Sequence, residues 1–280
     1  MSAESTLSTL IAGDGENIVV QDWPIDAGMP LRGVVLLVHG LGEHAGRYDH
    51  VARQLNAWGF AVRGYDQYGH GESPGLPGSL PTENRLLDDL ADMVDSTRTR
   101  MQKQTPLILL GHSMGGLVVA RFVSLRIRRV DGLILSSPAL NPGLNLVQKL
   151  LLAVLPNIAP NLRVGNGVKP EFISHDPAVV AAYRGDRLVH DRICARLAKF
   201  IATAGPQTLA LAEKWTVPTL LMYAGDDRLL NPQGSRDFSA AAPKDVVTAV
   251  CFESLYHEIF NELDASAVFA TLRKWLAARF

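Results

Sequence analysis

The sequence predicts an α/β fold, in which a mostly parallel sheet carries helices on both faces. Apolar runs of the length of strands buried on both faces alternate along the chain with stretches of helical periodicity, which is the pattern of successive βαβ units. Two of these runs end in glycine-rich segments. Because such folds place their ligands at the carboxyl ends of their strands, these two segments are the first candidates for a functional site.

Composition is that of an ordinary globular protein and gives no reason to expect a nucleic-acid partner. Of the 280 residues, 47% are hydrophobic and 20% are charged, with a net charge of −1. The two cysteines, Cys194 and Cys251, are too few for a disulfide framework, and neither lies in a sequence motif typical of a metal site. The amino terminus lacks the apolar core of a signal peptide, and we therefore expect a cytoplasmic protein.

The amino-terminal elements follow from local patterns. β-branched and apolar residues at 6–12 and 16–25 flank a turn-forming segment and predict a hairpin. A continuous apolar run predicts a buried strand at 33–38. The next helix and strand are expected at 49–58 and 60–65.

A long amphipathic helix is predicted over residues 83–103, because its leucines recur at helical spacing. The apolar face should hold Leu86, Leu87, Leu90 and Val94. The opposite, solvated face should hold Asp88, Asp89, Asp92 and Asp95.

Residues 107–119 carry the first functional signal. An apolar run ends at Gly111, a serine stands between Gly111 and Gly115, and a helical pattern then begins. A serine held in a strained turn between a strand and a helix needs small residues two positions away on each side, because larger side chains there would collide with neighbouring elements. Ser113 is therefore the candidate nucleophile.

The glycine-rich segment 39–44 follows the predicted strand at 33–38 and carries the second signal. Glycines there let backbone N–H groups turn into a cavity without obstruction, which an oxyanion hole requires. The backbone N–H groups of Leu41 and Met114 are the expected donors. Taken alone, the segment is equally compatible with a plain tight turn.

After a strand pattern at 132–140, no buried strand is predicted between residues 141 and 215. An insertion at the carboxyl end of a strand should cover the site as a cap. Helices are expected at 144–158, 177–183 and 191–215, the last with an interruption near Gly205-Pro206. The predicted organisation is a core of residues 1–140 and 216–280 with a helical cap of residues 141–215.

The first cap helix is rich in leucine, with Leu144, Leu146, Leu150, Leu151, Leu152 and Leu155. Its neighbourhood is basic, since residues 149–199 contain eight Lys or Arg against four Asp or Glu. Such a helix either packs against the body of the protein or lines an acyl tunnel and contacts a lipid interface. Peripheral membrane contact through the cap is thus one of two interpretations.

Two late strands, predicted at 218–223 and 246–252, lead to the remaining candidates. The carboxylates of Asp226 and Asp227 follow the first strand, and His257 follows the second. An acid after one late strand and a histidine after the next give the order Ser, Asp, His that serine hydrolases of this architecture use. Structural roles are expected for the other candidate histidines, His70 in a turn and His175 and His190 in the cap.

Together these residues resemble the α/β-hydrolase fold, and in particular its monoglyceride lipase and lysophospholipase-like branch. The similar motifs are His-Gly-Leu-Gly-Glu-His at 39–44 with Arg47-Tyr48, the segment 66–73, Gly-His-Ser-Met-Gly-Gly at 111–116, and Tyr256-His257-Glu258. The resemblance implies an eight-stranded sheet with the cap inserted after the sixth strand. It also implies supporting roles for His39, Gly40, Gly111, His112 and Gly115.

The activity that the resemblance implies is hydrolysis of carboxylic esters, above all of monoacylglycerols to glycerol and fatty acid, without a metal or an organic cofactor. Members of the branch usually place the acid three residues after a glycine, and Asp227 is one residue short of that spacing from Gly225. We nevertheless prefer Asp227 to Asp226, because Asp227-Arg228 matches the acid and the arginine that follows it in the family.

Three alternatives to this activity are compatible with the same fold. A lysophospholipase or a general carboxylesterase would use the same machinery. A hydrolase-fold binding protein without turnover is disfavoured, because a serine, a late acid and a histidine are all present. A dehalogenase or an epoxide hydrolase would need a carboxylate where Ser113 stands.

Overall fold

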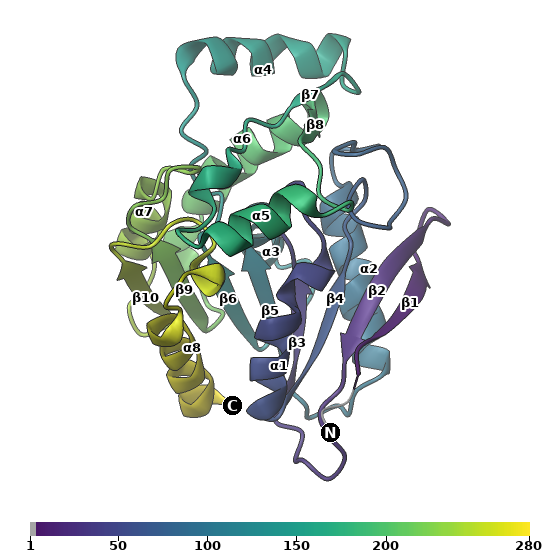
Figure 1. The fold of residues 1–280 in the computed structure, drawn as a ribbon, viewed down its shortest axis with the longest axis vertical. Coiled ribbons are helices and arrows are strands. Elements are labelled where there is room, and N and C mark those ends of the chain that lie inside the picture. Colours follow the sequence, from purple (N-terminus) through teal and green to yellow (C-terminus); the bar gives the residue numbers. More distant parts are fainter. Residues whose placement is uncertain (1–3) are drawn as a thin grey trace.

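The computed structural model describes residues 4–280, apart from the side chains of residues 147 and 149, and is built on one eight-stranded sheet (Figure 1). The strand order is β1-β2-β4-β3-β5-β6-β9-β10, and β2 pairs antiparallel with both β1 and β4 while all other neighbours are parallel. The strands are β1 Thr6–Ile11, β2 Asn17–Trp23, β3 Gly33–Val38, β4 Phe60–Tyr65, β5 Leu107–His112, β6 Gly132–Ser136, β9 Thr219–Ala224 and β10 Val247–Phe252. The mostly parallel eight-stranded sheet and the amino-terminal hairpin are confirmed.

Helices cover both faces of the sheet, and the alternation of strand side chains explains how. In β3, Val35 and Leu37 join the core beneath α1 and α8, whereas Leu36 and Val38 join the core beneath α2, α3 and α7. These helices are α1 Asp49–Ala57, α2 Arg85–Thr99, α3 Met114–Ser124, α7 Gln233–Ala241 and α8 Ser266–Arg279. Short 3₁₀ turns occur at Ala45–Tyr48, Pro170–Phe172, Ala212–Lys214 and Ile259–Asn261.

The register of the parallel strands brings the loops of the site together. Val38 at the end of β3 pairs with Gly111 near the end of β5, so the loop after β3 and the residue after β5 leave the sheet side by side. Ala224 and Phe252, the last residues of β9 and β10, also pair with each other. The four loops that carry the sequence candidates therefore leave the same edge of the sheet.

The solvated face predicted for α2 is wrong at one position. Asp89 is buried, and its Oδ1 accepts a hydrogen bond from Nε of the equally buried Arg85 at 2.6 Å. Asp89 lies one turn after Arg85 and three residues after Leu86, so it shares their inward face. Burial outweighs the pairing with Arg85 and raises the pKa of Asp89 to about 6. Asp88 and Asp95 are exposed, as expected.

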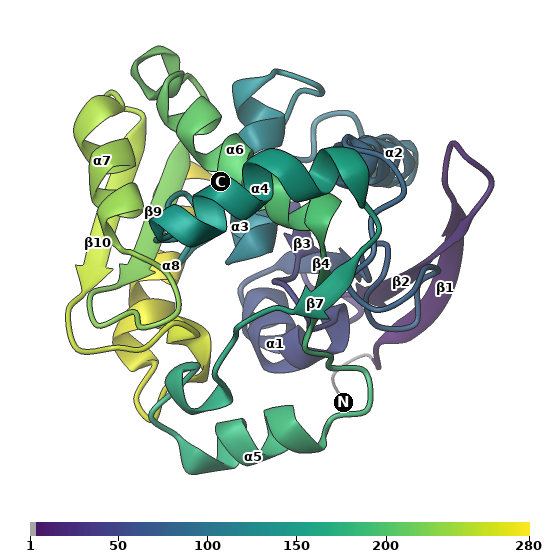
Figure 2. The same cartoon turned by 90° about the horizontal axis from the view of Figure 1, so that it is seen from above.

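Between β6 and β9 the chain forms a cap over the carboxyl ends of the parallel strands, at the end of the molecule opposite both termini (Figure 1). The cap contains α4 Leu146–Ile158, α5 Pro177–Gly185, α6 Ala195–Leu209 and an antiparallel ribbon of β7 Arg163–Gly165 and β8 Arg192–Cys194. Helix α6 packs on α3 of the core, and α4 packs on α6. Seen from above, α4 crosses the middle of the molecule and α5 runs along one side (Figure 2). A cap after the sixth strand is confirmed.

Two expectations for the cap are wrong. The β7–β8 ribbon was not predicted, because strands of three residues are too short to show a hydrophobic pattern. Helix α6 continues through Gly205-Pro206 without an interruption. There the glycine lets the helix approach the core, since a Cβ on Gly205 would lie 2.3 Å from the carbonyl oxygen of Leu140. Among residues 4–280, no helix has both the length and the apolarity needed to cross a bilayer.

Candidate active site

Ser113 occupies the sharp turn between β5 and α3. Its backbone has φ 54° and ψ −118°, a region that residues with a Cβ rarely adopt. The flanking glycines make this turn possible: a Cβ on Gly111 would lie 2.5 Å from the carbonyl oxygen of Gly115, and a Cβ on Gly115 would lie 2.1 Å from that of Val38. The strained turn therefore presents the Ser113 hydroxyl beyond the end of the central strand.

Ser113, His257 and Asp227 form one hydrogen-bonded chain. The His257 Nε2 lies 2.8 Å from the Ser113 Oγ, and the His257 Nδ1 lies 2.6 Å from the Asp227 Oδ2. The other oxygen of Asp227 accepts the backbone N–H groups of Leu229 and Leu230, each at 2.9 Å. This arrangement fixes the carboxylate and orients the imidazole with its Nε2 toward the serine.

The neighbouring Asp226 lies outside this chain of hydrogen bonds. Its half-exposed carboxylate pairs with the Arg228 guanidinium at 3.1 Å. Asp227, in contrast, is almost fully buried beside His257. The structure thus brings Asp227, and not Asp226, to the histidine.

The electrostatic surroundings favour a proton on His257. Burial alone would lower the pKa of His257, but the adjacent Asp227 carboxylate, helped by Glu258 and Glu43, raises it above its usual value. Burial would conversely raise the pKa of Asp227, but His257 and the backbone N–H donors lower it. The site is therefore suited to stabilise the imidazolium that forms when the histidine takes the serine proton.

His112 lies beside the catalytic candidates as a neutral ring. Its ring centroid is 4.8 Å from that of His257, and its Nδ1 lies 3.0 Å from the Ser136 Oγ. Burial, with a further contribution from His257, lowers the pKa of His112 to about 4. At neutral pH this ring adds no positive charge next to His257.

The loop after β3 is held on one side by Gln67. The His39 Nε2 accepts the backbone N–H of Gln67 at 2.9 Å, so the His39 Nδ1 carries the proton and donates to the Gly40 carbonyl at 2.7 Å. The Gln67 side chain donates to the His39 carbonyl at 2.7 Å. Leu41 and Met114, the expected oxyanion donors, line the same cavity as Ser113 and His257.

A cavity of about 470 Å³ lies between the sheet edge and the cap. Ser113 and His257 line its floor, and its walls are mainly apolar side chains from the cap, among them Leu151, Leu152, Leu155, Leu162, Ile193 and Ile201. Polar residues at the cavity include Glu43, Glu258, Asn166, Lys169 and Arg228. Its size and lining suit a ligand with a long apolar part and a small polar end.

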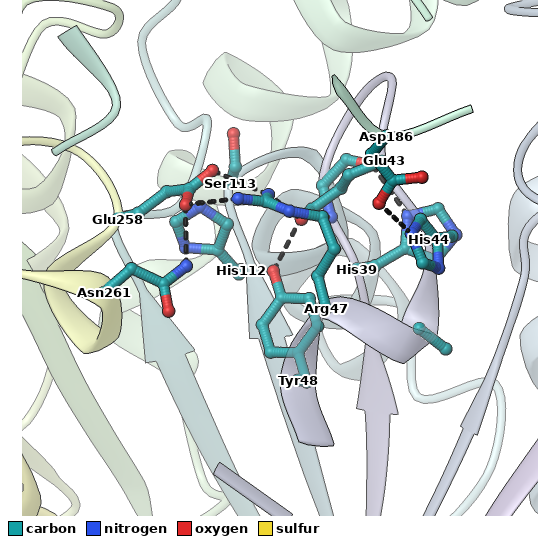
Figure 3. Close-up of polar contacts among 12 residues, drawn as sticks. His39, Glu43, His44, Arg47, Tyr48, His112, Ser113, Asp186, Glu258 and Asn261 are labelled. Carbon is teal, nitrogen blue, oxygen red and sulfur yellow. Dashed lines mark hydrogen bonds and ion pairs between the residues drawn. The ribbon is translucent and has the colours of Figure 1, made fainter. Parts of the chain in front are cut away.

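The sequence motifs contained a second group of polar residues to which no role was assigned. Figure 3 shows Glu43, Arg47, Tyr48, Glu258 and Asn261 joined by hydrogen bonds and ion pairs next to Ser113. We call this group the Arg47 network. The four-residue spacing of Glu43 and Arg47 could have indicated the ion pair between them. The contact between Arg47 and Glu258 spans 211 residues, and no local pattern indicates it.

The other three candidate histidines, His70, His175 and His190, make structural contacts. His70 is buried in its loop, where its Nδ1 lies 3.0 Å from the Tyr68 carbonyl. His190 reaches from the cap to the Gly69 carbonyl at 3.0 Å. His175 stacks on Tyr256, with ring centroids 3.6 Å apart, and contacts Glu262. Within residues 4–280, no group of three or more His, Cys, Asp and Glu side chains is arranged to hold a metal ion.

Comparison with known proteins places this site in a known context. Residues 29–264 match the family model Hydrolase_4, described as serine aminopeptidase, S33. The chain is 34% identical to a monoacylglycerol lipase of Mycolicibacterium smegmatis, with 94% of each chain covered. A crystal structure of the Paleococcus ferrophilus monoacylglycerol lipase superposes with a TM-score of 0.82 at 32% identity, covering 99% of this chain and 100% of that one.

A longer protein also contains a region similar to this chain. It is an uncharacterized abhydrolase domain-containing protein of Dictyostelium discoideum, 31% identical over 98% of this chain. The chain spans 29% of the length of that protein, whereas it spans nearly the whole of the two lipases.

Proposed function

The chain belongs to the serine aminopeptidase S33 family, and from this premise we propose that it hydrolyses monoacylglycerols to glycerol and fatty acid, with Ser113 as nucleophile. The observation that carries the proposal is the hydrogen-bonded chain of Ser113, His257 and Asp227 on the floor of a largely apolar cavity of about 470 Å³. The two lipases that resemble the whole chain support the same substrate class. It is a serine ester hydrolase.

The proposed reaction proceeds through an acyl-enzyme. His257 takes the proton of the Ser113 hydroxyl while the Ser113 Oγ forms a bond to the ester carbonyl carbon. The negative charge that develops on the carbonyl oxygen is stabilised by the backbone N–H groups of Leu41 and Met114. The bond to the glycerol oxygen then breaks, and His257 returns the proton to that oxygen. Asp227 keeps the imidazole in place and stabilises its cation.

Water completes the reaction by the same route. His257 takes a proton from a water molecule whose oxygen bonds to the acyl carbon, the bond to the Ser113 Oγ breaks, and the proton returns to the serine. The acyl chain occupies the apolar part of the cavity in both steps. Each methylene buried there contributes about 0.8 kcal/mol of binding free energy, so long acyl chains should bind better than short ones.

The outer face of α4 supports a further part of the proposal, contact between the cap and a lipid surface. Leu146, Leu150, Val154 and Ile158 recur every four residues and are exposed, with Leu150 at 69% and Ile158 at 73%. Leu152 and Leu155 on the same helix line the cavity. A helix with one apolar face on the cavity and another on the outside can lie at a lipid surface and pass acyl chains inward.

A hydrolysis panel tests the substrate class. It compares monoacylglycerols of increasing chain length, lysophospholipids, short p-nitrophenyl esters and an aminoacyl p-nitroanilide, each with wild type and Ser113→Ala. We expect the highest kcat/KM on long-chain monoacylglycerols and only background release with Ser113→Ala. Preference for lysophospholipids, or for the anilide, would reassign the substrate while leaving the serine mechanism in place.

A further inference from the structure

The Arg47 network connects the two loops that carry the proposed oxyanion donor and the proposed base. Arg47 lies in the 3₁₀ turn before α1, and its guanidinium contacts carboxylates from both loops (Figure 3). It donates to the Glu43 Oε2 at 2.5 Å and to the two oxygens of Glu258 at 2.8 and 2.7 Å. The guanidinium also lies 4.8 Å from the ring centroid of Tyr183 on α5 of the cap.

These charges are removed from solvent, which is costly. The side chain of Arg47 is 10% exposed, and those of Glu43 and Glu258 are 4% and 7% exposed. Buried ion pairs often contribute little net stability, because desolvation offsets their attraction. A group of three such charges beside the catalytic candidates therefore calls for a functional explanation.

On the oxyanion side, Glu43 holds the backbone next to Leu41. Its Oε1 accepts the N–H of Gly40 at 2.5 Å and the hydroxyl of Tyr48 at 2.6 Å. The packing is close, since a Cβ on Gly40 would lie 2.7 Å from the Glu43 Oε1 and 3.2 Å from the Ser113 Cβ. Any shift of the Glu43 carboxylate would therefore move the peptide that precedes the Leu41 donor.

On the base side, Glu258 holds the residue next to His257. Its carboxylate receives both Arg47 donors and the Asn261 side chain, the latter at 2.7 Å. Its backbone N–H donates to the Ile173 carbonyl of the cap at 2.8 Å. Side chain and main chain of Glu258 are thus both fixed directly after the proposed base.

The network also carries charge that acts on His257. Asp227, Glu258 and Glu43 act on this imidazole, the His112 ring lies beside it, and Arg47 pairs with both glutamates. Two carboxylates and one guanidinium leave the network with a net charge of −1. Burial would raise the pKa of Glu43, but Arg47 and its other neighbours lower it to about 2, so this carboxylate stays ionised over the whole working pH range.

We propose that Glu43, Arg47 and Glu258 are positioning residues, which set the placement of the Leu41 N–H and of His257 relative to Ser113 for ester hydrolysis. The role rests on the proposed function, because it needs the serine mechanism. Arg47 acts through both carboxylates, so the two halves of the site move as one unit. A misplacement of about 1 Å in such a site costs about 100-fold in rate, which is the scale of effect that the network can control.

Glu258→Gln tests this role, because it keeps the shape of the side chain and removes its charge. With p-nitrophenyl butyrate we expect kcat to fall by about 10- to 100-fold while KM changes by less than about threefold, since the variant disturbs the transition state more than substrate binding. In the pH profile of kcat/KM, the fall on the acid side, which we call the acid limb, should move to lower pH. The reason is that a carboxylate that raises the pKa of His257 is lost. Labelling of Ser113 by a fluorophosphonate should slow in parallel.

Asp89→Asn is the matched control. It neutralises another buried carboxylate that pairs with an arginine, on α2. We expect this variant to change Tm but neither kcat nor the acid limb. Glu43→Gln serves as the second test variant and decides the question if Glu258→Gln does not fold.

The proposal is overturned if both test variants keep the kcat and the acid limb of wild type, or if they differ from wild type only in Tm, as Asp89→Asn does. The short ester keeps this test independent of the natural substrate. If wild type hydrolyses p-nitrophenyl butyrate but no monoacylglycerol, the proposed substrate is wrong and the test of the network still stands.

Discussion

The cavity has two walls of opposite character. At the sheet edge, polar side chains are buried and fixed: His257 has a partner on each ring nitrogen, and Asp227 uses both of its oxygens. On the cap side, α4 contributes Leu151, Leu152 and Leu155 to the apolar lining, and it leaves further apolar side chains exposed on its outer face. Under the proposed function, the core would perform the chemistry and the cap would select the esters that reach it.

Removal of the nucleophile should have the largest effect, and it should be the same for every ester. Ser113→Ala is expected to lower kcat by about five to six orders of magnitude, because the proposed mechanism needs the serine hydroxyl for the chemistry and not for packing. The check is the kcat on a short and a long ester together with Tm. Substantial turnover by the purified, folded variant would disprove the triad and, with it, the role assigned to the sheet edge.

The two neighbouring aspartates allow a sharper test of the same wall. Asp227→Asn should lower kcat by about 10⁴-fold, since an amide favours the wrong tautomer of the histidine that it orients. Asp226→Asn should change kcat by less than about threefold, because the half-exposed carboxylate of Asp226 pairs with Arg228 at the surface. Both variants are assayed on one short ester. Equal losses, or a larger loss at Asp226, would contradict the geometry.

The pH dependence of wild type probes the electrostatics of the sheet edge. The base must be neutral to take the serine proton, so kcat/KM is lost as the pH falls through the pKa of His257 in the free enzyme. Because Asp227 and the nearby glutamates raise this pKa, the acid limb should lie above pH 6.5, the usual value for histidine. Below the limb, kcat/KM should fall about tenfold per pH unit. A limb below pH 6.5 would mean that desolvation dominates.

The contrast between the two walls also explains what the sequence could reveal. The elbow around Ser113 was predictable because its constraint is local: the strained turn requires Gly111 and Gly115 within two residues of the serine. The sheet was predictable for a similar reason, since each buried strand shows as a continuous apolar run. The choice of Asp227 over Asp226 went against the usual spacing from a glycine and rested on the resemblance of Asp227-Arg228 to the family, whereas the fold places His257 beside Asp227.

Features that depend on distant partners could not be predicted. Arg47 contacts Glu258 across 211 residues, and neither of the two sequence motifs that contain them indicates that they pair. Asp89 has the character of a surface residue, but it is buried together with Arg85, whose guanidinium also pairs with Asp14 across 71 residues. Helix α6 continues through Pro206, and the close approach of Gly205 to Leu140 is a tertiary contact that no local pattern encodes.

The cap should give the smallest effects, and these should depend on the substrate. Leu150→Ser and Ile158→Ser alter exposed positions of α4 that are not among the residues lining the cavity. Each replacement removes apolar area from the proposed lipid-facing surface. About 25 cal/mol of binding free energy is lost for each Å² of apolar surface that is no longer buried in the lipid. We expect weaker co-sedimentation with vesicles and a several-fold lower kcat/KM on a long-chain monoacylglycerol presented in them.

The short soluble ester and a matched surface variant separate delivery from stability. Ile11→Ser changes an isoleucine that is as exposed as Ile158, at 70%, but lies on β1 at the edge of the core. This control should bind vesicles like wild type and hydrolyse both esters like wild type. The α4 variants should match wild type on p-nitrophenyl butyrate, because Ser113, His257 and Asp227 are untouched. If they instead lose Tm and activity on both esters alike, with vesicle binding unchanged, then the leucines of α4 hold the cap together and the cap does not collect substrate from a lipid surface.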